Sequence, residues 1–216
     1  MKKFASALVA MATALAISPT AMADSIVTLG SSSSSTSATS VSSSNLGTLV
    51  TSISGTATNA FTASYTESVY IGGADALCPT CLNFVYTLSN TAGSDFIDNI
   101  STSSFGAFTV AEGNLNPSTG SVDVLTGYDL SGVVNLSYLT SPVTAGATSD
   151  SFVLFTNATY YEQGSITFQD GTIASGNALV GSTPEPSSLL LLGTGFLGLA
   201  LALFRKNKPS GLVLHA

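Results

Sequence analysis

The sequence predicts an all-β protein, built as a single antiparallel β-sandwich between two apolar terminal segments. Three observations lead to this fold class. Between the two ends, short runs rich in Val, Thr, Phe and Tyr are separated by turn residues about every eight to fifteen positions. Phe84, Tyr86 and Leu88 occupy alternate positions, as on a half-buried sheet. No long segment of this region repeats its apolar residues with the period of a helix.

The expected strands follow from these runs and their boundaries. They cover residues 46–54, 60–71, 82–89, 105–112, 122–126, 133–140, 151–158, 165–169 and 172–175. Asp170-Gly171, between the last two runs, is a strong signal for a hairpin. The sandwich is therefore predicted over residues 46–181. We expect its core to contain Phe61, Phe84, Phe96, Phe105, Phe108, Phe152, Phe155 and Phe168.

The N-terminus has the plan of a secretory signal peptide. Lys2 and Lys3 precede an apolar run at 4–17, and Ala21 and Ala23 form a small-residue site for signal peptidase. We expect residues 1–23 to be removed after the general secretion machinery has exported the chain.

A segment rich in Ser and Thr follows, at residues 24–45, with five consecutive serines at 31–35. Such a composition buries too little apolar surface to offset the entropy lost on ordering. The sequence therefore predicts a flexible linker between the signal peptide and the sandwich.

Charge is distributed very unevenly along the chain. All five Lys and Arg residues lie in the terminal segments and the single histidine is His215, so residues 24–183 contain no basic side chain. The same region holds every acid of the chain except Glu185. The uncompensated negative charge of this region repels the phosphates of nucleic acids, so nucleic acids are not expected as partners.

The missing basic residues also restrict the chemistry of the exported part. No Ser-His-Asp arrangement, Cys-His pair or Schiff-base lysine can form there. We therefore expect a protein that is not an enzyme and that has no cofactor.

Acidic residues leave two alternatives open. Asp95 and Asp98 are the acids closest in sequence. A carbohydrate-active enzyme typically uses two carboxyl groups as its acid and base. We expect them instead to be solvated residues of a turn between 93 and 99. Asp123 with Asp129, or Asp95 with Asp98, are candidates for an irregular calcium loop, although no Asp-x-Asp-x-Asp-Gly loop occurs and no metal site is predicted.

Cys78 and Cys81 are the only cysteines. In an exported protein two thiols at this spacing are expected to form a disulfide that closes a tight loop between two strands. A redox-active pair or half of a zinc site are the alternatives.

Near the C-terminus, Pro184, Glu185 and Pro186 precede Ser187. Each proline ring fixes φ and restrains the residue before it, so no regular helix is expected to run through this motif. The motif is therefore predicted to be accessible to a processing enzyme.

An apolar run and a basic cluster come next. Residues 189–204 carry no charge, and sixteen residues of helix reach about 24 Å, close to the hydrocarbon thickness of about 30 Å. Arg205, Lys206 and Lys208 follow this run, which places them on the cytoplasmic side by the positive-inside rule. A transmembrane helix is therefore predicted at 189–204.

The order of these three parts, at residues 182–216, resembles the PEP-CTERM sorting signal of exported bacterial proteins. The resemblance implies recognition by an exosortase, a membrane-embedded enzyme that resembles transpeptidases, and an association with exopolysaccharide and the biofilm matrix. It implies that the chain is anchored transiently in the inner membrane, processed at the motif, and released to the cell surface or beyond. A permanently anchored surface protein with one membrane span is the alternative.

Overall fold

The structure is a computed structural model, which describes residues 27–30, 40–116, 120, 122–124, 126–138, 141–183 and 188–206. The predicted signal peptide at 1–23, with Ala21 and Ala23, lies outside the described residues.

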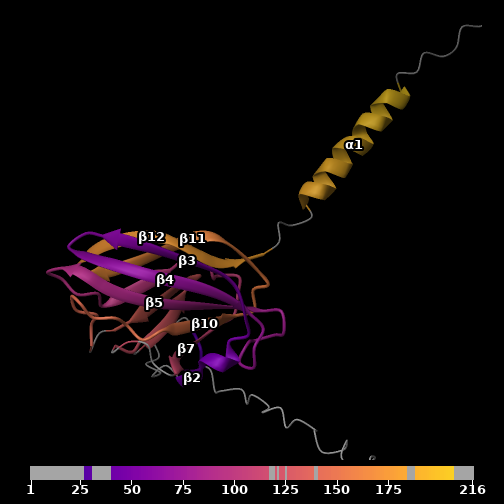
Figure 1. Cartoon of the computed structure of the whole chain (residues 1–216). Helices are drawn as coiled ribbons and strands as arrows, with labels where there is room; N and C mark the ends of the chain where they lie inside the picture. The colour runs from indigo at the N-terminus through magenta and orange to yellow at the C-terminus, as the bar shows by residue number, and fades with distance from the viewer. Residues whose placement is uncertain are drawn as a thin grey trace, which may run out of the picture.

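Two sheets form the body of the protein, which we call the β-domain (Figure 1). The larger sheet has the order β1 (Val27–Thr28), β7 (Val110–Asn116), β10 (Phe152–Thr156), β5 (Leu82–Gly93), β4 (Phe61–Ile71) and β3 (Thr48–Thr58). The smaller sheet has the order β12 (Thr172–Ser182), β11 (Tyr160–Asp170), β6 (Asn99–Thr102), β9 (Val133–Ser137) and β8 (Thr126–Leu130). The predicted all-β class, with mainly antiparallel strands, is confirmed.

Differences from the predicted strands concentrate at their boundaries. The last hairpin is longer than predicted, because β11 and β12 pair over their whole lengths. The strand predicted at 122–126 starts instead at Thr126, and the one predicted at 105–112 starts at Val110. Strand β6 was not predicted, since a turn was expected to reach Asn99, and it gains its partners only from β9 and β11.

Part of the predicted linker belongs to the larger sheet. β1 pairs antiparallel with β7, while β2 (Ser40–Ser42) pairs parallel with it. Val41 of β2 is fully buried, and Leu46 packs in the same cluster. The β-domain therefore begins before the predicted boundary at 46. One of its strand pairs is parallel. Composition alone assigns these segments to solvent, but the backbone of β7 hydrogen-bonds to them.

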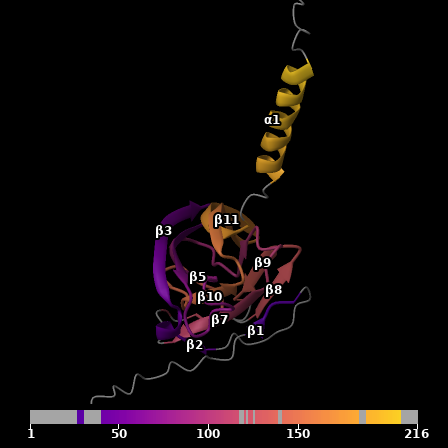
Figure 2. The ribbon, with the colours of Figure 1, turned by 90° about the vertical axis from the view of Figure 1, so that its right-hand side faces the viewer.

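The core lies between the two sheets, which Figure 2 shows wrapped around it. Five of the eight predicted phenylalanines are buried in this core: Phe61, Phe84, Phe105, Phe152 and Phe168. Phe155 is buried as well, but in a second cluster with Val41 and Val153. Phe108 is partly buried against the core. The prediction for Phe96 was wrong, since its side chain is 41% exposed. Ile97 takes the inward position of the bridge to Val143, and alternation along the extended chain turns Phe96 outward.

The β11–β12 hairpin sets the direction in which the chain leaves the β-domain. Gly171, at its tip, has a φ of +58°, a conformation that glycine adopts without steric cost. Asp170 pairs with Thr172 beside this tip, and Tyr160 pairs with Ser182 at the other end. We call the end with Ser182 the exit end and the opposite one the hairpin end.

Candidate functional site

The C-terminal segment starts from an edge strand. β12 borders the smaller sheet and ends at Ser182, and Thr183 after it is exposed. Helix α1 (Ser188–Lys206) begins shortly afterwards and extends away from the β-domain (Figure 1). Pro184, Glu185, Pro186 and Ser187 fall between these two elements, outside the described residues.

Helix α1 has apolar side chains that are largely exposed. Leu191 is 74% exposed, and Phe196 and Leu197 are 63% exposed. Within the described residues, no helix reaches the length and apolar content needed to cross a membrane. The transmembrane span at 189–204 therefore stays a prediction. Arg205 and Lys206 belong to the last turn of α1, and Lys208 lies beyond the described residues.

Side chains hold β12 against the larger sheet at a seam where β3 and β12 meet without a backbone ladder. The Asn59 side chain donates through Nδ2 to the Ile173 carbonyl at 2.9 Å, and the Tyr65 hydroxyl donates to the Asn177 carbonyl at 2.8 Å. Glycines make room for that hydroxyl, since a Cβ at Gly55 or Gly176 would overlap it. An open groove of about 650 Å³, lined mainly by β3 and β12, lies along this seam. These bonds fix the strand from which the C-terminal segment departs.

Glu67 supplies a further bond across this seam. Its carboxyl group is fully buried, and Oε2 accepts a hydrogen bond of 2.7 Å from the Leu179 amide. Burial raises the pKa of Glu67 to about 7, although the Leu179 amide and the Tyr86 hydroxyl oppose the rise. No basic side chain is present in the β-domain sequence to compensate a charge at this site.

Glu112 occupies a comparable place at the second seam, where β7 and β1 of the larger sheet meet β8 (Figure 2). A Cβ on Gly127 of β8 would overlap the Glu112 carboxyl group, so this glycine lets the side chain reach the facing sheet. Burial raises the pKa of Glu112 to about 7, and the Gly127 amide opposes the rise. Each seam of the β-domain therefore contains one buried glutamate.

Asp123 and Asp150 form a carboxyl pair that the sequence did not indicate. A hydrogen bond between their side chains, followed by burial and by the charge of Asp150, raises the pKa of Asp123. Asp150 also accepts a hydrogen bond of 2.8 Å from the Gly120 amide.

Two of the carboxyl groups predicted in candidate pairs have other partners. Asp98 accepts a hydrogen bond from the Asn99 side chain at 3.0 Å, and Asp129 accepts one from the Gly132 amide at 2.9 Å. At Asp95 it is the backbone carbonyl, not the carboxyl group, that accepts a hydrogen bond, from the Asn90 side chain at 2.8 Å. Across the described residues, no group of three or more His, Cys, Asp or Glu side chains is placed to hold a metal ion.

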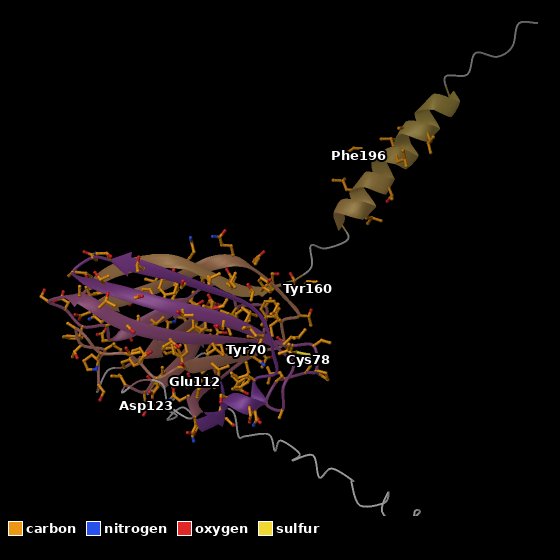
Figure 3. All side chains as sticks on the ribbon, viewed as in Figure 1. Tyr70, Cys78, Glu112, Asp123, Tyr160 and Phe196 are labelled. Carbon is orange, nitrogen blue, oxygen red and sulfur yellow. A yellow bond between two sulfur atoms is a disulfide. The ribbon has the colours of Figure 1, made fainter. Side chains whose placement is uncertain are left out.

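Cys78 and Cys81 form the predicted disulfide, in the loop between β4 and β5 (Figure 3). The Cys81 amide donates to the Cys78 carbonyl at 3.1 Å, and Gly72 donates to the Cys81 carbonyl at 3.0 Å. The bridge therefore belongs to the turn that leads β4 into β5 at the exit end.

The buried glutamates were missed because every acid in this region was treated as a solvated charge. The alternation of residues along β4 would have indicated that Glu67 points inward. Phe61, Ala63, Tyr65, Glu67 and Val69 occupy the same face of the strand, and the structure buries all five. An acid at an inward position of a strand, with no cation available, predicts a carboxyl group with a raised pKa.

Comparison with known proteins gives one match, to the C-terminal segment. Residues 182–206 match the family described as the PEP-CTERM protein-sorting motif. No curated protein matches the chain, and no solved structure matches it. The match covers the end of β12, the motif with Pro184-Glu185-Pro186, and all of α1. The chain therefore carries a PEP-CTERM sorting motif, the mark of an exported protein that an exosortase sorts.

Proposed function

We propose that this chain is a non-enzymatic exported protein that is anchored transiently in the membrane, cut near Pro184-Glu185-Pro186, and released to the cell surface or extracellular matrix. One observation carries the proposal: the sorting motif begins at Ser182, which is also the last residue of β12. Cleavage after this point removes α1 and leaves every strand of the β-domain in the product. Processing would thus release a folded domain.

The proposed anchor is the segment 189–204. It has no charged residue, and Arg205, Lys206 and Lys208 come directly after it. Basic residues next to an apolar run resist translocation, so the run would stop in the membrane with its C-terminus in the cytoplasm. Pro184 and Pro186 would keep the cleavage segment, to which they belong, out of the helix that follows it.

The proposal of a non-enzymatic role has two supports. No His, Lys or Arg lies in residues 24–183. The carbohydrate-active alternative needs two carboxyl groups separated by about 5 Å or more, so that the sugar or a water molecule fits between them. Asp98, one of the two acids expected for that alternative, accepts a hydrogen bond from the Asn99 side chain at 3.0 Å instead. A role in an exopolysaccharide matrix is implied by the kind of sorting signal.

The test is to replace Pro184, Glu185 and Pro186 with alanine and express the full chain in a host that contains the processing enzyme. The variant should accumulate as an uncleaved precursor in the membrane fraction, because alanine favours extension of the helix through the cleavage segment. Pro209→Ala, a change outside the matched motif, is the control and should be processed normally. Release of the triple variant at the normal mass and rate would overturn the proposal. Intact mass spectrometry of the released protein would identify both cleavage sites.

A further inference from the structure

Both ends of the β-domain expose large apolar side chains, but the two exposed tyrosines of β11 lie at the exit end, whereas Phe96 and Ile173 are exposed at the hairpin end. Tyr160 is 56% exposed and Tyr161 is 40% exposed, and they pair with Ser182 and Gly181, the last residues of β12. Leu49 and Val50, at the start of β3, are 54% and 44% exposed. These four residues, Leu49, Val50, Tyr160 and Tyr161, form what we call the exit patch.

Strand pairing places both halves of the exit patch at the same end of the molecule. Leu49 pairs with Tyr70 near the end of β4, and Tyr70 pairs with Asn83 near the start of β5. The Leu82 amide next to it donates to the Ala158 carbonyl at 2.8 Å, two residues before Tyr160. Figure 3 shows Tyr70, Cys78 and Tyr160 together at the end from which the chain leaves toward α1.

The segment that joins this end to α1 is short. Six Cα steps separate Ser182 from Ser188, and a fully extended chain covers at most about 3.6 Å per step, or about 20 Å in all. A domain tethered so closely to a membrane-inserted helix has its exit end next to the lipid head groups. Tyrosine, with an apolar ring and a polar hydroxyl, is a residue type that is enriched at this level of a bilayer.

The positions of the acidic residues also favour an arrangement in which the exit end, rather than the hairpin end, faces the membrane. Asp170 lies at the tip of the hairpin, and the Asp98 amide donates to the Gln169 carbonyl beside it. Asp95 is close to the far end of β5. Glu162 is an exposed acid near the exit patch, so this end suits zwitterionic lipids better than anionic ones.

We propose that the exit patch contacts the surface of a zwitterionic bilayer while the chain is anchored, so that the β-domain sits on the membrane with its hairpin end in solution. This inference rests on the proposed membrane anchor. It gives the contact a role in sorting, since a domain held in this way keeps residues 184–186 at the level of the head groups, within reach of a membrane-embedded enzyme.

Single tryptophans test the proposal, because the chain contains none. The full chain with Tyr160→Trp, and separately with Phe96→Trp at the hairpin end, is reconstituted into phosphatidylcholine vesicles whose acyl chains carry bromine close to the head groups. Phe96 is the control because its side chain is also exposed, at 41% against 56% for Tyr160, but lies at the opposite end of the β-domain. Flotation establishes membrane association, and circular dichroism checks that both variants are folded.

The expected result is that Tyr160→Trp loses most of its emission to bromine quenching and shifts to the blue, while Phe96→Trp emits as it does in vesicles without bromine. A chain that floats but shows equal emission for both variants, with and without bromine, would overturn the exit-patch contact and leave the anchor intact. A chain that does not float would overturn the anchor, and the contact with it.

Discussion

The Glu67 carboxyl group accepts a hydrogen bond from the Leu179 amide at 2.7 Å, and this bond joins the two sheets of the β-domain. Glu67 lies on β4 in the larger sheet, while Leu179 lies on β12 at the edge of the smaller one. A side chain thereby provides, at this seam, the partner that a backbone amide would find in a ladder. The acceptor is a titratable group, which makes the seam sensitive to pH.

Glu67 and Glu112 should make the domain less stable as pH rises toward neutrality. Both have a pKa of about 7 in the folded protein, against an ordinary value of 4.5. Between these values the folded state binds more protons than the unfolded state, so the free energy of unfolding falls with rising pH. The stabilisation is complete below pH 4.5 and lost through pH 7, and a shift of this size corresponds to about 3 kcal/mol for each group.

Thermal unfolding between pH 5 and pH 8 measures this effect. The melting temperature should fall with pH in the wild-type chain, and the slope should flatten in Glu67→Gln and Glu112→Gln, since neither glutamine titrates. Glu162→Gln is the control, because its side chain is exposed and its substitution should leave the slope unchanged. A wild-type melting temperature that rises from pH 5 to pH 8 would contradict the assignment.

Gly176→Ala should destabilise the β-domain through Tyr65. The added methyl group would overlap the Tyr65 hydroxyl, which passes between Gly55 and Gly176 to reach the Asn177 carbonyl. Overpacking of this kind costs about 1–3 kcal/mol. Gly30→Ala, with no atom near the added Cβ, should cost much less.

Urea unfolding of a double-mutant cycle with Tyr65→Phe isolates this contact. Tyr65→Phe alone should destabilise, because it removes the hydrogen bond to the Asn177 carbonyl. In the double variant the cost of Gly176→Ala should shrink but not vanish, since the oxygen that overlaps most is gone while two ring carbons still lie within 3 Å of the added Cβ. Strictly additive costs would show that the two residues do not share this site.

Cys78 and Cys81 should be oxidised in the native exported protein. Thiol labelling without reductant should modify neither residue, and full labelling of both would contradict the disulfide. Because the closed loop is short, reduction should lower the free energy of unfolding by only about 2 kcal/mol on the chain-entropy model. The double variant with Cys78→Ser and Cys81→Ser should unfold near the reduced wild-type chain, which makes it the matched control.

Neutral replacements of Arg205, Lys206 and Lys208 should remove the proposed membrane intermediate. Without these charges the apolar segment has little to resist translocation, so the precursor should disappear from the membrane fraction. Fractionation and immunoblotting check this, with Lys2→Arg and Lys3→Arg, which keep the charge of the N-terminus, as the control. An undiminished membrane precursor in the neutral variant would show that the basic cluster does not stop transfer.

The sequence determined the features that depend on local pattern. The alternation around Phe84, Tyr86 and Leu88 indicated β5, and Asp170-Gly171 indicated the hairpin of β11 and β12. The PEP-CTERM motif was likewise readable, because a sorting signal is recognised as a short linear segment and its parts stand in sequence order. The disulfide followed from two cysteines with no other partner in the chain.

Only the tertiary structure decided which residues far apart in the sequence come into contact. Val41 is buried in a second cluster, with Leu115 and Val153 of its own sheet, although the composition of its segment suggests solvent, because one edge of β7 is free to pair with β2. Asp123 pairs with Asp150 rather than with Asp129, and Glu67 reaches Leu179, across separations that no local pattern encodes. The physical reason is that a strand's own residues specify which side chains point inward, whereas the partner of an inward acid and its pKa depend on the facing sheet.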